Sequence, residues 1–346
     1  MGGDDRSLTG QADTRPWRHG LVDFSILELG RVREGGSRRD AMDEARILGQ
    51  HAEQQGYKRL WVAEHHNMPT VTTAATSLII AHIAAGTRHI RVGAGGIMLP
   101  NHSPYVIAEQ FGTLATLFPD RIDLGLGRAP GTDQYTLRAL RRDPASAENF
   151  PRDVLELQAY LAPATPGQPI EAVPGSGTEV PLWILGSSLF GAQLAAELGL
   201  PFGFASHFAP GSLDQALAIY RDRFRPSAQQ QRPHALVGVN IIAAESDAEA
   251  QYLATSQQMS FTHMVRGTRR LTQPPIADIE TYWSPREKMH VQQMLACSII
   301  GGPETVRRGV DALLERTHAD ELMIVSDMFD FGKRLRSFEI IAGLMR

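Results

Sequence analysis

The chain has 346 residues, of which 42% are hydrophobic, and its 34 Lys and Arg against 38 Asp and Glu leave a formal net charge of -4. This balance excludes a nucleic-acid-binding protein that relies on a basic face, and it provides no polybasic segment for an anionic membrane. The single cysteine, Cys297, excludes an intramolecular disulfide framework and a cysteine-based zinc cluster. No apolar run approaches the roughly 18 residues of a membrane span. We therefore expect a cytoplasmic globular protein without nucleic-acid or membrane partners.

Residues 1–19 are polar and lack the apolar core of a secretory signal, so we expect a flexible N-terminal extension. Residues 20–346 read as one domain in which short apolar segments alternate with helical patterns. Eight of the apolar segments are expected to be strands, at 21–27, 59–63, 90–93, 121–126, 182–185, 202–205, 235–243 and 322–325.

Helices are expected between these strands. Ser37 and Asp40 give the S-x-x-D start signal of a helix that Gly56 stops. A later helix carries a single apolar stripe, formed by Ile107, Phe111, Leu114, Ala115 and Phe118. A long stretch at 128–180 follows the fourth strand, and a polar, irregular stretch at 266–284 follows the seventh. The second stretch is long enough to be a mobile active-site segment, and the sequence leaves open whether it is a lid.

Eight strands that alternate with helices predict an α/β fold, namely a single (β/α)8 TIM barrel with loop insertions after strands 4 and 7. The alternative is a doubly wound parallel sheet, which the lack of a dinucleotide-binding fingerprint disfavours. In a barrel, functional groups lie where the strands end, on the C-terminal face. The strand ends are therefore the places to search for chemistry.

The second strand is followed by Glu64, His65, His66 and Asn67. Imidazoles transfer protons near neutral pH, which makes His65 and His66 candidate catalytic residues. The alternative is that one histidine is exposed to solvent and the other packs in the core. A zinc site is disfavoured because adjacent histidines splay apart and seldom share one ion, so no metal is expected.

Glycines mark the ends of the third and fourth strands. Gly95 and Gly96 belong to a glycine-rich run that either lets a flat ligand approach the backbone or forms a tight turn. The fourth strand ends in G-x-G-x-x-x-G, which departs from the nucleotide-binding fingerprint. Arg128 in this segment is placed to hold a phosphate, with an ion pair to Asp133 as the alternative.

The fifth strand is followed by Gly186, Ser187 and Ser188, and a helix containing Gly191 opens at once. Backbone N–H groups at a helix start bind anions, although a serine at this place is also a common N-cap. His207 follows the sixth strand. Together these strand-end groups predict a phosphorylated, planar cofactor in the mouth of the barrel.

Four segments resemble those of the bacterial luciferase-like flavin monooxygenase family in their order and in their placement on strands. They are Leu60–Asn67 (LWVAEHHN), Val92–Pro100 (VGAGGIMLP), Arg121–Arg128 (RIDLGLGR) and Gly301–Val306 (GGPETV). The resemblance spans 21–325 and is strongest to the YhbW-like branch of these oxidoreductases. It implies a (β/α)8 barrel that uses reduced FMN as cosubstrate and O2 as oxidant.

The resemblance also implies roles for individual residues. His65 matches the family's catalytic histidine beside the flavin ring, Arg128 matches a phosphate contact, and the Gly95–Gly96 bond matches a non-proline cis peptide. Ser188 matches a second phosphate contact. The candidate cofactor-binding residues are Gly95, Gly96, Arg128, Gly186, Ser187, Ser188, Gly191 and His207.

Gly127 stands where luciferase has a cysteine, which speaks against light emission and a long-chain aldehyde substrate. The expected function is that of an FMNH2-dependent monooxygenase acting on an unidentified small organic substrate. A separate flavin reductase and a homodimer are expected from the family. The alternatives are an F420-dependent hydride-transfer oxidoreductase of the same superfamily, a non-catalytic flavin-binding protein and, more distantly, a metal-dependent barrel hydrolase.

Overall fold

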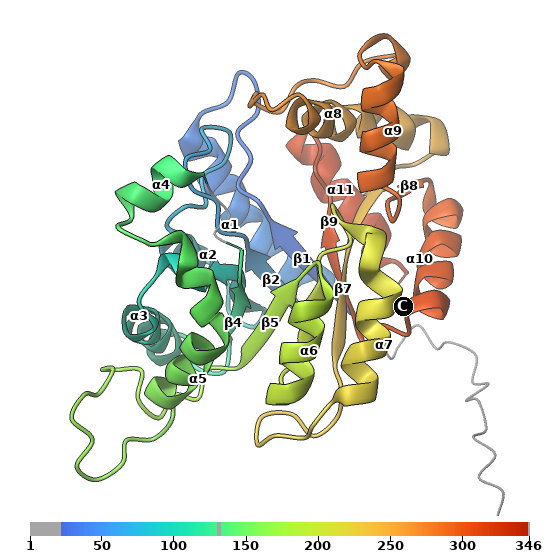
Figure 1. Cartoon of the computed structure of the whole chain (residues 1–346). Helices are drawn as coiled ribbons and strands as arrows, with labels where there is room; N and C mark the ends of the chain where they lie inside the picture. Colours follow the sequence, from blue (N-terminus) through green and yellow to red (C-terminus); the bar gives the residue numbers. More distant parts are fainter. Residues whose placement is uncertain (1–21, 130–132, 345–346) are drawn as a thin grey trace, which may run out of the picture.

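The computed structural model describes residues 22–129 and 133–344, so the predicted extension at 1–19 lies outside the described residues. Eight parallel strands close into a barrel that helices surround, which confirms the predicted (β/α)8 fold (Figure 1). The strands follow the order β6-β5-β4-β3-β2-β1-β9-β7, and pairing of β6 with β7 closes the ring. The doubly wound alternative is therefore wrong.

The barrel strands lie close to where the apolar segments predict them. They are β1 (Asp23–Glu28), β2 (Arg59–Val62), β3 (Arg91–Met98), β4 (Ile122–Gly127), β5 (Leu182–Gly186), β6 (Phe202–Phe204), β7 (Ala235–Ala243) and β9 (Glu321–Val325). β3 is longer than predicted because it continues through its glycines, with a register shift between Gly95 and Ile97. A short strand that the sequence did not reveal, β8 (Ile299–Gly301), pairs with β7 outside the barrel ring.

The helices alternate with the strands, and those that surround the barrel pack buried apolar residues against it, whereas α9 packs on α8. They are α1 (Arg38–Gln55), α2 (Thr76–Ala85), α3 (Pro104–Leu117), α4 (Gln134–Ala139), α5 (Phe150–Leu161), α6 (Leu189–Leu198), α7 (Leu213–Arg223), α8 (Asp247–Val265), α9 (Pro285–Met294), α10 (Pro303–Thr317) and α11 (Phe331–Ala342). Ser37 and Asp40 form the predicted capping box of α1. Within the described ranges, none of these helices has both the length and the apolar character needed to cross a bilayer.

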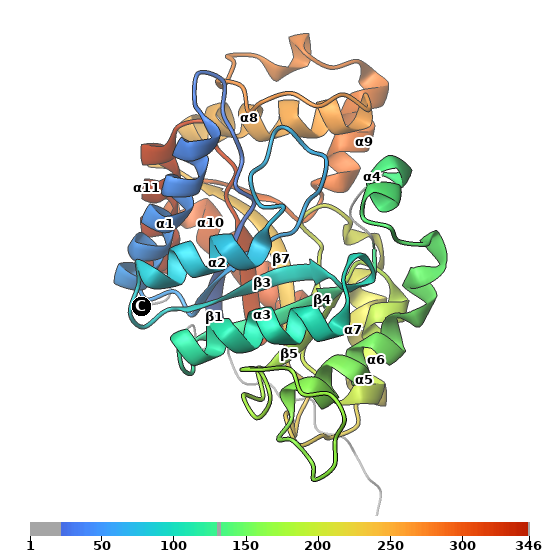
Figure 2. The same ribbon diagram turned by 90° about the vertical axis from the view of Figure 1, so that its left-hand side faces the viewer.

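The predicted insertions after the fourth and seventh strands are present. The first contains α4 and α5, and the second contains α8, the segment 266–284 and α9. α8 and α9 lie side by side at one end of the barrel in both views (Figures 1 and 2). Thr272 makes two backbone hydrogen bonds with the loop after β1, at 2.8 and 3.0 Å, and the Arg269 side chain donates to the carbonyl of Asn67. The segment thus joins the loops after β1 and β2, and its mobility stays a prediction.

The opposite end of the barrel is closed by a buried ion-pair network. The Arg59 guanidinium donates to Asp123 at 2.7 Å and to Glu321 at 2.8 Å. Trp61 donates to the same aspartate at 3.1 Å. Buried charges need such partners, and residues at this end of a TIM barrel serve stability rather than chemistry.

Candidate active site

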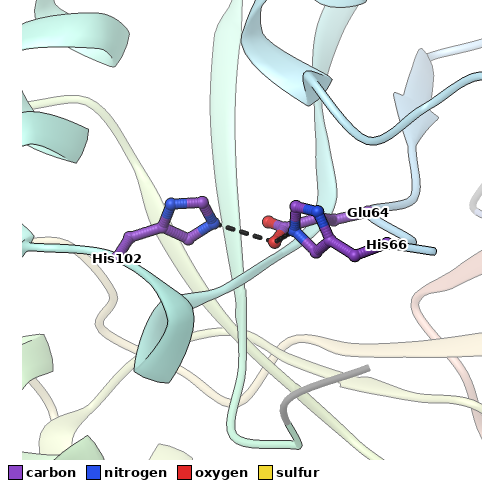
Figure 3. Close-up of side chains that lie close together, drawn as sticks. All are labelled: Glu64, His66 and His102. Atoms are coloured by element: carbon purple, nitrogen blue, oxygen red, sulfur yellow. Dashed lines mark hydrogen bonds and ion pairs between the residues drawn. The ribbon is translucent and has the colours of Figure 1, made fainter. Parts of the chain in front are cut away.

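Glu64, His66 and His102 form a cluster where β2 and β3 end (Figure 3). Glu64 is fully buried, and its Oε1 accepts from Nε2 of His66 at 2.6 Å and from Nε2 of His102 at 2.8 Å. Its Oε2 accepts from the backbone N–H of Met98 at 3.0 Å. Burial alone would raise the pKa of Glu64, but the hydrogen bonds from His102 and His66 outweigh burial and lower that pKa to about 2. Glu64 is therefore an anion that ties the loop after β2 to the chain after β3.

His65 has quite different surroundings from its neighbour His66. Its Nδ1 is buried and has no hydrogen-bond partner among the described residues. Nδ1 of His207, after β6, is likewise buried and unpartnered. Burial and then the positive charge of Arg31 lower the pKa of His65 to about 4, and burial and then His65 lower the pKa of His207 to about 4. Both imidazoles are therefore neutral at pH 7, and each has a buried nitrogen with hydrogen-bonding capacity to spare for a ligand.

Gly95 and Gly96 lie within the barrel wall and are joined by a cis peptide bond, as the family resemblance implies. A Cβ at Gly95 would lie 2.8 Å from Leu27 Cδ1, and a Cβ at Gly96 would lie 2.5 Å from the carbonyl oxygen of Gly125. Both positions therefore require glycine because β3 packs closely against its neighbours. Contact of these glycines with a cofactor stays a prediction.

Arg128 lies over the first turn of α6, the helix for which Ser188 is the N-cap. The guanidinium carbon of Arg128 lies 4.0 Å from the ring centre of Phe190, in the first turn of this helix. Ser188 is the N-cap of α6 in extended conformation, and its side chain makes no capping hydrogen bond. The first N–H groups of a helix lack intrahelical acceptors. We name Arg128, Ser188 and these N–H groups the α6 corner, and its charge and donors suit a phosphate.

The structure supports one of the simpler interpretations and not the other: Ser188 is an N-cap, but Asp133 has partners other than Arg128. Asp133, the alternative partner of Arg128, instead accepts from the backbone N–H of Thr136 at 2.9 Å and lies 3.9 Å from Arg269. Gly191 is buried in α6, where an added Cβ would lie 3.3 Å from Phe202 Cε2, a tight contact. Gly186 ends β5, and half-buried Ser187 follows it directly.

All of the predicted site residues follow or end strands β2, β3, β4, β5 and β6, and so lie at the C-terminal end of the barrel or in its wall. The sequence showed Glu64 beside the two histidines but did not reveal its contact with His102. A signal for their contact existed, because β2 and β3 are neighbouring parallel strands whose ends must meet. Which of His65 and His66 turned toward Glu64 could not be read from their spacing.

Comparison with known proteins agrees with this arrangement. The family model described as "Luciferase-like monooxygenase" matches residues 22–321. A luciferase-like monooxygenase of Escherichia coli strain K12 is 51% identical over 320 residues, which cover 92% of this chain and 96% of that protein. The crystal structure of apo-MsnO8 shares 35% identity and a TM-score of 0.86, covering 93% of this chain and 98% of that chain.

More distant structures share the fold alone. The oxygenating constituent of 3,6-diketocamphane monooxygenase from Pseudomonas putida, solved with FMN, has 16% identity and a TM-score of 0.68, covering 93% of this chain and 97% of that chain. An F420-dependent secondary alcohol dehydrogenase has 13% identity and a TM-score of 0.68, and the match covers 94% of this chain and 99% of that chain. The long match to the family model and the 51% identity decide the assignment. The chain therefore belongs to the luciferase-like monooxygenase family of flavin-dependent oxidoreductases.

Proposed function

We propose that the chain is a monooxygenase that uses reduced FMN and O2 to oxidise a small organic substrate. The observation that carries the proposal is the α6 corner, where Arg128 and Ser188 offer positive charge and donors to a phosphate. The corner lies at the same end of the barrel as His65 and His207, whose buried Nδ1 atoms have no partner among the described residues. FMN carries both a phosphate and a planar ring, so one molecule would meet both groups of residues.

Each group of site residues has a separate proposed role in such an enzyme. When bound, reduced FMN supplies the electrons with which O2 is activated. The α6 corner holds the phosphate, and Nδ1 of His65 is available to accept a proton at the reacting end of the site. The segment 266–284, which joins the loops after β1 and β2, limits the access of water. His66 is also a proposed catalytic residue, although its Nε2 is engaged with Glu64.

The electrons would come from outside the chain. The glycine pattern at the end of β4 is not a dinucleotide-binding fingerprint, so the sequence gives no motif for a nicotinamide dinucleotide that would reduce the flavin. We therefore propose a separate flavin reductase as a partner. A homodimer and a cytoplasmic location stay predictions.

Anaerobic titration of the purified chain tests the proposal. We expect FMNH2 to bind and reduced F420 to leave the protein unchanged, and we expect the bound FMNH2 to react with air at a rate different from that of free FMNH2. Binding of reduced F420 in place of FMNH2 would support the hydride-transfer alternative. Binding of FMNH2 with the reoxidation kinetics of the free molecule would support a flavin-binding protein without turnover.

A further inference from the structure

The cluster of Glu64, His66 and His102 is not explained by flavin binding. Its three ligand atoms, one carboxylate oxygen and two imidazole nitrogens, all lie within 4.8 Å of one another. The two imidazole rings are tilted by 48° with centroids 6.2 Å apart, so they approach the same oxygen from different sides rather than stacking (Figure 3). This is a convergent set of metal-binding atoms from two neighbouring loops.

The charge at Glu64 distinguishes it from the other buried carboxylates. Among the described residues, each of the other buried carboxylates has an arginine partner: Glu28 with Arg334, Asp123 with Arg59 and Arg91, Glu321 with Arg59, and Asp327 with Arg31. Glu64 is equally buried, but its hydrogen-bond partners in the described chain are two imidazoles, the backbone N–H of Met98 and the side-chain amide of Asn101, none of which carries a permanent charge. An anion in a low-dielectric site is costly unless a cation balances it. Within the described ranges, the negative charge of Glu64 therefore has no permanently positive side chain beside it, and a bound cation would balance it.

We propose that Glu64, His66 and His102 bind a Zn2+ ion through Oε1 of the glutamate and Nε2 of both histidines. Two histidines and one glutamate are a common donor set of zinc enzymes, which leave a further position open to water. The ion replaces the two hydrogens that now point at Oε1, and each neutral imidazole carries its proton on Nδ1 instead. This goes beyond the proposed flavin function and does not depend on it.

Side-chain movements of about 1 Å would let the cluster accept the ion. Metal–ligand bonds near 2.1 Å with tetrahedral angles separate the ligand atoms by about 3.4 Å. The present 2.6 and 2.8 Å contacts must therefore open by less than about 1 Å, and the two imidazole nitrogens, which lie within 4.8 Å of each other, must close by at most about 1.4 Å. The backbone N–H of Met98 already holds the other carboxylate oxygen, as outer partners of metal ligands do. The side chains of His66 and His102 are 15% and 25% exposed, which gives an ion a path to the buried carboxylate.

The sequence disfavoured zinc because adjacent histidines seldom share an ion, and that argument holds for His65 and His66. His65 makes no contribution to the cluster. The second imidazole comes instead from the loop after β3, which the sequence pattern alone did not bring to Glu64.

Calorimetric titration of the full, chelator-treated, flavin-free chain with Zn2+ tests the proposal. We expect one ion per chain, and binding weaker by roughly a hundredfold or more in His66→Ala and in His102→Ala, because loss of a ligand costs at least as much as loss of an outer partner. Co2+ in the same site should give the visible absorption of a low-coordinate ion, lost in Glu64→Gln. Circular dichroism verifies that each variant is folded.

Two control variants are matched to these changes. His65→Ala removes the adjacent imidazole, and His89→Ala removes an exposed imidazole from a turn far from the cluster. Both should bind Zn2+ as the unmodified chain does. The zinc site would be refuted if the unmodified chain failed to bind one ion, or if His66→Ala and His102→Ala bound Zn2+ as tightly as the unmodified chain does. The cluster would then be a hydrogen-bonded network of a carboxylate and two imidazoles. Because the titration contains no flavin, neither result bears on the proposed monooxygenase.

Discussion

Replacing Arg128 with alanine should weaken the binding of FMN far more than that of riboflavin. The two flavins differ in the phosphate, and the α6 corner places the guanidinium and the free end of the helix where a phosphate would be held. A hydrogen bond to a charged group contributes about 1.5–3 kcal/mol, which corresponds to a Kd for FMN that is roughly 10- to 150-fold higher. Riboflavin, which lacks the phosphate, should lose less than about threefold.

The fold should survive this change. The contact of Arg128 with Phe190 is a cation–π pair at an exposed arginine, worth about 0.5–1 kcal/mol, so the free energy of unfolding should fall by no more than this. Arg138→Ala, at an exposed position of α4, removes one positive charge without touching the α6 corner and is the matched control. Fluorescence titration with both flavins gives the two Kd ratios. An equal loss of affinity for FMN and riboflavin would show that Arg128 does not contact the phosphate.

Three further predictions follow from the site and the barrel wall. His65→Ala should fold and bind FMN but lose substrate oxygenation, and unchanged turnover would remove His65 from the mechanism. Gly96→Ala should lower the free energy of unfolding by roughly 1–3 kcal/mol, because the new Cβ would lie 2.5 Å from a backbone oxygen, whereas Gly211→Ala, with no atom within 4 Å, is the control in the same denaturant titration. The pKa of His207 is about 4 in the fold and near 6.5 when unfolded, so the unfolded chain binds more protons between these values. Its contribution to the free energy of unfolding therefore falls by about 1.4 kcal/mol for each pH unit between 6.5 and about 4 and is constant below that. Urea titrations at a series of pH values should find this slope reduced in His207→Gln.

Much of the fold could be read from hydrophobic periodicity. The buried strands are short apolar runs, and α1 begins where Ser37 and Asp40 predict it, because capping chemistry is local. β8 escaped detection because three residues carry too little periodicity to distinguish a strand from a loop. The (β/α)8 assignment then placed the candidate site residues near the C-terminal ends of the strands, and the strand bounds agree with these positions, whereas the roles of the residues stay predictions.

The site was less accessible to sequence reasoning because side-chain direction is set by tertiary contacts. The spacing of His65 and His66 says that they diverge, but not that His66 turns to Glu64 while Nδ1 of His65 remains buried and unpartnered. The contact between Glu64 and His102 joins residues 38 positions apart and exists because β2 and β3 are adjacent. The pairing of Arg128 with Phe190 likewise depends on the adjacency of β4 and β5, which brings the chain after β4 to the start of α6 and which no local pattern encodes.

The ion-pair network around Arg59 shares none of its residues with the loops that carry the proposed chemistry. Loops at the C-terminal end of the barrel can therefore be exchanged or lengthened without loss of the ion pairs at its N-terminal end. This separation gives the scaffold evolutionary freedom: substrate preference can diverge between paralogues while the determinants of folding remain constant. Directed evolution of new oxidations on this chain has the most latitude in the loops that follow the strands, and the least at Arg59, Asp123 and Glu321.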